Sequence, residues 1–146
     1  LERLEHIDRF GANLAGNIRD GLSQDVRAIA GAEQIRTQVW RTVRECLSRY
    51  DVLLTPTAPV LPFPVEQNYP EVIDGARLEN YIDWIAQAFL ITLSGFPAGS
   101  TPAGLSASGL PVGLQIIGPR LGEPTILAVA KLLQKIRPVG WPPAAI

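Results

Sequence analysis

The chain has 146 residues, and its 13 Lys and Arg against 14 Asp and Glu give a formal net charge of −1. This length predicts a single domain spanning residues 1–146. The balanced charge excludes a strongly basic nucleic-acid binder and an acidic tail protein. No apolar run approaches the ~20 residues that cross a bilayer, and no charged-then-apolar signal peptide opens the chain, so we expect no membrane partner.

The cysteine and histidine content limits the chemistry further. Cys46 is the only cysteine and His6 the only histidine. These counts exclude a disulfide framework, a thiolate metal cluster and a multi-histidine metal site. We therefore expect a cytosolic protein with no metal ion, and the absence of GxGxxG and GxxxxGK[ST] motifs predicts no cofactor.

The composition is unusually apolar for a small domain. Charged residues make up 18% of the chain, against about 25% in typical globular proteins, and the mean hydropathy is +0.14. A small domain has much surface for its volume and should be more polar than average. The chain also has no methionine. We expect a piece of a larger assembly, with one apolar face covered by an upstream part of the same protein or by a second chain, and a homodimer is one such arrangement.

Residues 1–50 are predicted to be helical. Apolar side chains recur every three or four residues over 4–22, where Gly11 and Gly16 weaken the helix enough to bend or break it. Ser23 is the expected N-cap of a second helix over residues 26–50. Its arginines could suit a phosphate, but interspersed acidic residues favour a solvated face. The apolar stripe of this helix comprises Val26, Ile29, Ile35, Val39, Val43, Leu47 and Tyr50.

Residues 51–146 are predicted to contain strands, a proline-rich loop and further helices. A short strand over 52–54 is followed by five prolines within residues 56–75, which indicate an extended loop of the kind that forms the rim of a cleft. A proline-dependent partner motif is the less favoured alternative. A third amphipathic helix is expected over 78–93, followed by a turn into a strand at 94–104.

The C-terminal third has the clearest strand pattern. A hairpin loop at 106–109 precedes a strand over 110–118 that is apolar on both faces, as expected of a buried strand. Gly122 and Pro124 open a last helix that reaches Ile136, and the proline-containing tail that follows cannot continue it.

No catalytic set is evident in these residues. The serines lack a GxSxG context, HExxH is missing, and Cys46 fits a buried inert thiol. His6 is expected at the surface or against a partner, and Asp83 is the acid most suited to a site. Both lysines, Lys131 and Lys135, fall on the last helix, and nothing in their spacing supports a Ser–Lys pair.

Four segments in the same order resemble one family. They are YDVLLTPTAP (50–59), YIDWI (81–85), LSGFPAGSTPAG (93–104) and GLPVGLQIIGP (109–119). They resemble the carboxy-terminal region of amidase signature enzymes, the serine-dependent C–N hydrolases whose members extend to the tRNA-dependent amidotransferases. The resemblance extends over residues 25–141.

The resemblance implies an α/β fold. This chain would form part of an α/β/α layered mixed sheet of the amidase signature type, with amphipathic helices flanking a few short strands. It also implies hydrolysis of a small-molecule amide by a Ser–Ser–Lys triad, whose three residues lie upstream in such enzymes. No catalytic residue is therefore expected in this segment, and the isolated chain is expected to be inactive.

The resemblance leaves this segment a place in the wall of the acyl pocket. Thr55, Trp84, Phe89 and Phe96 are the expected pocket residues, although core packing would also explain Trp84 and Phe89. The alternative function is a non-catalytic binding or assembly module on the same scaffold. A distinct hydrolase using Asp83 or His6 is the least favoured hypothesis.

Overall fold

The computed structural model describes residues 6–7 and 9–140. The chain divides into two compact units, one before and one after the boundary between Arg36 and Thr37, and each is described by itself. The motif end at Trp141 and the residues beyond it lie outside the described part, as does Leu4, the first apolar residue of the predicted N-terminal helix.

The N-terminal unit consists of α1 (Ala12–Ser23) and the first part of α2 (Val26–Leu47). The helix predicted over 4–22 begins only after Gly11, which takes the N-cap position, whereas Gly16 lies inside the regular helix. One of the two glycines thus breaks the apolar repeat, because a glycine loses more backbone entropy in a helix than any other residue.

The predicted cap of α2 is wrong. The Ser23 hydroxyl ends α1 and donates to the carbonyl oxygen of Asp20 at 2.7 Å. The cap is instead formed by Asp25, whose carboxylate accepts the backbone N–H of Ala28 at 2.8 Å. A carboxylate directly before the first helical residue is well placed to accept one of the free N–H groups there and favours the positive end of the helix dipole.

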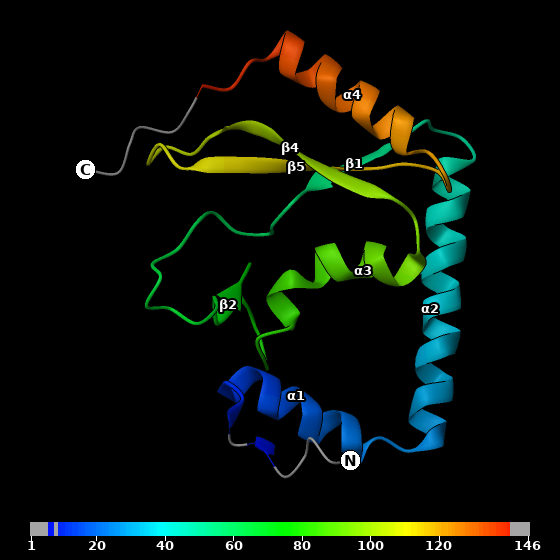
Figure 1. Cartoon of the computed structure of the whole chain (residues 1–146), viewed down its shortest axis with the longest axis vertical. Helices are drawn as coiled ribbons and strands as arrows, with labels where there is room; N and C mark the ends of the chain where they lie inside the picture. Colours follow the sequence, from blue (N-terminus) through cyan, green and yellow to red (C-terminus); the bar gives the residue numbers. More distant parts are fainter. Residues whose placement is uncertain (1–5, 8, 141–146) are drawn as a thin grey trace. The chain divides into compact units, whose positions relative to one another are not determined.

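The C-terminal unit is built on a three-stranded antiparallel sheet in the order β1–β5–β4 (Figure 1). The strands are β1 (Leu53–Pro56), β4 (Ala98–Leu105) and β5 (Pro111–Ile117). The strand predicted over 110–118 is therefore the central strand. The hairpin loop before it is confirmed, since the Ser106 N–H bonds the Leu110 carbonyl at 2.8 Å.

One face of the sheet is covered by α4 (Glu123–Ile136), which lies across β4 and β5 in Figure 1. The contact is close because Ile126 packs against glycines on both strand ends. A Cβ at Gly99 would lie 3.0 Å from Ile126 Cγ2, and a Cβ at Gly118 would lie 2.9 Å from its Cγ1. Larger residues at these two positions would push the helix off the sheet.

The opposite face packs against α2 and α3 (Ala86–Ser94). Val43 of α2, Ile91 of α3 and Ile117 of β5 form the buried cluster between them. The α3 helix ends at Gly95, whose left-handed conformation (φ 71°) terminates many helices. The sheet of this unit thus lies between helical layers on both faces.

The helix predicted over 78–93 is shorter in the structure. The regular helix starts at Ala86, preceded by the 3-10 turn η2 (Asp83–Ile85). The preceding turn is held by the Asp83 carboxylate, which accepts the N–H groups of Glu79 and Asn80 at 2.9 and 3.2 Å. This local capping by an aspartate competes with helix formation.

A small hairpin of β2 (Val72–Ile73) and β3 (Ala76–Arg77) occurs near the end of the proline-rich loop. Its two turn residues, Asp74 and Gly75, both have positive φ, at 49° and 77°. An Asp-Gly pair is a recognised hairpin signal, so the sequence contained the information for this element.

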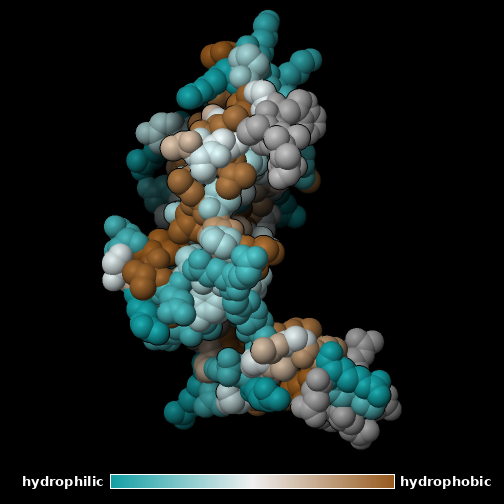
Figure 2. Space-filling view, turned by 90° about the vertical axis from the view of Figure 1, so that its left-hand side faces the viewer, coloured by the Kyte–Doolittle hydropathy of each residue, from teal (hydrophilic) through white to brown (hydrophobic). Residues whose placement is uncertain are grey.

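Many large apolar side chains are bare. Within the described part, only six apolar side chains are buried, of which Ile116 and Ile117 are completely so. Figure 2 shows apolar atoms reaching the surface among hydrophilic ones on the face it displays. None of the described helices is both long enough and apolar enough to cross a membrane. The exposed positions include Leu22, Val26, Ile29, Ile35, Leu121, Leu127 and Ile136.

Candidate functional site

A row of polar side chains crosses the sheet on the face opposite α4. Thr55, Gln115 and Ser100 are direct neighbours in the strand register. The Thr55 hydroxyl donates to Gln115 Oε1 at 2.9 Å, and Gln115 is buried. Beside it, the Thr57 and Ser100 hydroxyl oxygens lie 2.7 Å apart. Gly113 leaves room for this pair, because a Cβ there would lie 2.7 Å from Thr57 Oγ1.

A hollow of about 220 Å³ adjoins this row, between the proline-rich loop and Trp84. The rings of Phe63 and Trp84 form an edge-to-face pair with centroids 5.5 Å apart. The indole N–H of Trp84 is buried and has no hydrogen-bond partner in the described part of the chain. A buried donor without an acceptor costs about 1–3 kcal/mol, so Trp84 is held here at an energetic cost. The lining comprises Thr57, Ala58, Val60, Leu61, Pro62, Phe63, Trp84, Pro111, Val112 and Gly113.

The four predicted pocket residues do not share one hollow. Trp84 lines the hollow of the proline-rich loop, whereas Thr55 belongs to the polar row on the sheet. Phe89 is partly buried on α3. Phe96 stacks on Trp40 with ring centroids 6.4 Å apart, in a different hollow. Their assignment to an acyl pocket stays a prediction.

Two residues of this region escaped the sequence analysis as site candidates. Thr57 and Ser100 are 43 positions apart, and only the strand register brings their hydroxyls together. The small residues that flank them in TPTAP and PAGSTPAG were the one available signal, since a closely approached backbone requires small side chains.

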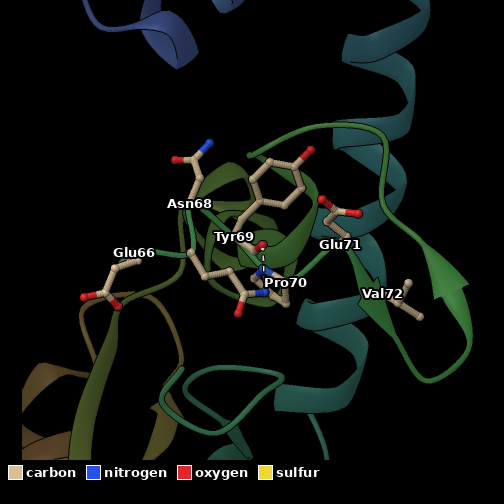
Figure 3. Close-up of a pocket in the computed structure, with 7 residues that line it drawn as sticks. Glu66, Asn68, Tyr69, Pro70, Glu71 and Val72 are labelled. Atoms are coloured by element: carbon tan, nitrogen blue, oxygen red, sulfur yellow. Dashed lines mark hydrogen bonds between the residues drawn. The ribbon is translucent and has the colours of Figure 1, made fainter. Parts of the chain in front are cut away.

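A larger hollow of about 580 Å³ is formed by one loop alone, residues 66–72 (Figure 3). The side chains of Glu66 and Glu71 lie on opposite sides of this loop and do not converge. The Gln67 side chain is occupied locally, since its Nε2 donates to the Tyr69 carbonyl at 3.1 Å. The hollow therefore offers no paired carboxylates for acid–base chemistry.

No serine is activated by a base among the described residues. All six serines lie in that part of the chain, and each hydroxyl bonds either a backbone carbonyl or another hydroxyl. Lys131 and Lys135 are both exposed on α4. A serine nucleophile needs a base within hydrogen-bond reach, and residues 6–7 and 9–140 provide none.

The other candidate groups have local roles or none. The Asp83 carboxylate is engaged by two backbone N–H groups, His6 is exposed, and Cys46 is partly buried on α2. Within residues 6–7 and 9–140, no three His, Cys, Asp or Glu side chains are grouped so as to hold a metal ion.

Comparison with known proteins identifies the origin of this arrangement. The sequence pattern of the family described as Amidase matches residues 11–127. The chain belongs to the amidase family. Its fold is accordingly α/β, as the four motifs implied, and an aryl acylamidase of bacterial origin in the amidase signature family superposes with a TM-score of 0.82. That structure is 29% identical, and the match covers 92% of this chain and 28% of the other.

The amidase relatives are much longer than this segment. The second A-type component of a glutamyl-tRNA(Gln) amidotransferase from Clostridium acetobutylicum is 33% identical over 106 residues, which are 73% of this chain and 21% of that protein. An acylamidase from Rhodococcus erythropolis is 33% identical over 111 residues, covering 75% of this chain and 23% of the other. The chain thus spans about a fifth of the length of these relatives, and it is an amidase-family fragment.

Proposed function

We propose that this chain is the C-terminal portion of an enzyme that hydrolyses the C–N bond of a carboxamide. An upstream part would supply the Ser–Ser–Lys triad, and the finished enzyme would act in the cytosol. Water would add to the acyl carbon and the amine would leave, with a serine as the transient acyl carrier. The observation that carries the proposal is the mismatch of coverage, since most of this chain matches relatives of which it spans only about a fifth.

Two structural observations support the proposal. The described serines have no base, as expected if the nucleophile lies elsewhere. Apolar side chains such as Val26 and Leu127 are 81% and 69% exposed, as expected of surfaces that an upstream part or a second copy of the chain covers.

We also propose that the hollow beside Trp84 forms part of the acyl pocket. Its walls come from the proline-rich loop and from Trp84, and they are almost entirely apolar. Such walls suit an aryl or other hydrophobic acyl group better than a charged one. Thr55, Phe89 and Phe96 would then support or flank the pocket rather than line this hollow.

The test uses the native protein that carries this sequence. Its intact mass is measured, and it is incubated with an N-acyl anilide while release of the aromatic amine is followed. We expect a native product several times longer than this chain, hydrolysis of the anilide, and labelling by a serine-reactive fluorophosphonate upstream of Leu1. The isolated chain, as the matched control, should show no turnover and no label.

Two outcomes would overturn the proposal. Turnover by the isolated chain would place a complete catalytic set within it. A native product that begins near Leu1 would favour the alternative, a non-catalytic binding or assembly module. A Trp84→Ala variant of the native protein tests the pocket separately: we expect a KM about tenfold higher for a bulky aryl amide than for acetamide, relative to the parent.

A further inference from the structure

A second hollow, of about 360 Å³, lies between the C-terminal half of α2 and the loop that joins β5 to α4. It is separate from the hollow beside Trp84 and shares no lining residue with it. Most of its walls are apolar, and two arginines stand at its edge. The residues that matter for its chemistry are Trp40, Leu47, Phe96, Pro119, Arg44 and Arg120.

An aromatic wall forms one side of this hollow. The rings of Trp40 and Phe96 lie nearly parallel, with an angle of 22° and centroids 6.4 Å apart. Trp40 is nevertheless 41% exposed. A large aromatic surface that remains open inside a concave site is available for a ligand with a flat apolar body.

The two arginines have no acidic partner among the described residues. The ion pairs between side chains in that part of the chain engage Arg36, Arg49 and Arg77, but not Arg44 or Arg120. The Arg44 guanidinium lies over the Trp40 ring, 5.3 Å from its centroid. A guanidinium stacked in this way keeps its N–H edge free for hydrogen bonds to an anion.

The described lining contains no carboxylate to repel an anion. The only other polar side chain in it is Ser48, whose hydroxyl donates to the Glu45 carbonyl at 2.8 Å and is thus already satisfied. Two positive charges beside apolar walls attract an anion more strongly than the same charges in open water, because the walls lower the local dielectric constant.

We propose that this hollow binds an organic anion, with a carboxylate head on Arg44 and Arg120 and an aryl body against Trp40 and Phe96. A guanidinium matches a carboxylate with two parallel hydrogen bonds. The volume of about 360 Å³ is enough for a bicyclic aromatic acid. This site does not depend on the proposed amide hydrolysis, because its residues take no part in that pocket.

Isothermal titration of the native protein with naphthoate tests the site. Naphthylmethanol, which has the same rings without the charge, and acetate, which has the charge without the rings, are the matched controls. We expect naphthoate to bind at least about tenfold more tightly than either control, and its affinity to fall as salt is added. Equal binding of naphthylmethanol, or of inorganic phosphate, would overturn the proposal, as would no binding of naphthoate.

Variants then test the two arginines. Arg44→Gln and Arg120→Gln should each weaken naphthoate binding about tenfold while leaving naphthylmethanol unaffected. Arg41→Gln, an exposed arginine on the same helix outside the hollow, is the control and should change nothing. Arg44→Lys keeps the charge without the fork and should be intermediate. Unchanged affinity in both glutamine variants, with helical circular dichroism intact, would show that the arginines are not used and the proposal is wrong.

Discussion

The two halves of α2 have the same apolar repeat and entirely different environments. In the C-terminal half, Val43 is only 8% exposed because it packs against Ile91 and Ile117. In the N-terminal half, Val26 and Ile29 continue the stripe but are 81% and 56% exposed. Periodicity therefore determines which face of a helix is apolar, but not whether anything is present to cover it. The difference locates the surface where a covering part would bind.

The largest expected effect is in the buried half. Ile117→Ala should lower the free energy of unfolding by about 2–5 kcal/mol, because it leaves a cavity in a fully buried cluster. Ile29→Ala on the exposed stripe is the matched control and should cost about 0.5 kcal/mol or less in the isolated chain. Chemical denaturation followed by circular dichroism measures both.

The same pair of variants sharpens the comparison in the native protein. If an upstream part covers the stripe, Ile29→Ala should there cost about 2 kcal/mol, as a buried isoleucine does. An unchanged cost of about 0.5 kcal/mol or less would mean that the stripe stays bare, and the covering proposed for it would be wrong.

A smaller effect is expected at the polar row. Gly113→Ala should cost about 1–3 kcal/mol by overpacking, because the new methyl group would lie 2.7 Å from Thr57 Oγ1. Adding Thr57→Ala should restore part of the loss, which a double-mutant cycle on thermal unfolding would measure. Gly16→Ala in α1, where nothing lies within 4 Å, is the control and should be neutral or stabilising.

The smallest effect concerns the start of α2. Asp25→Ala should cost about 1 kcal/mol, because it removes the acceptor of the Ala28 N–H. Ser23→Ala, two positions earlier, should cost a few tenths of a kcal/mol at most. Urea denaturation of both variants decides the matter, and a larger loss for Ser23→Ala would reverse the assignment of the cap.

Local patterns predicted the elements whose causes are local. The strand ending at Ile117, the hairpin loop at Ser106 and the helix opened by Pro124 all follow from alternation, turn residues and capping preferences. The helix start at residue 78 was wrong because the Asp83 carboxylate holds the preceding turn. That competition is invisible to a count of apolar spacing.

The polar row and the hollows lay beyond sequence reasoning for a different reason. Thr55 and Gln115 are 60 positions apart, and their hydrogen bond exists only because β1 and β5 pair in one particular register. Register is set by the whole sheet and its covering helices rather than by any short motif. The family motifs marked the right segments, but not which of their side chains meet.

The seat of Ile126 between Gly99 and Gly118 has a practical consequence for anyone who redesigns this protein. The isoleucine fits a slot with two glycine sides, so the three positions form one inheritable unit although the chain scatters them. A randomised library that varies them independently would discard most of its members before any activity screen begins. Varying the outward side of α4 at Leu127 and Ile136, which are both exposed, leaves the docking of the helix untouched.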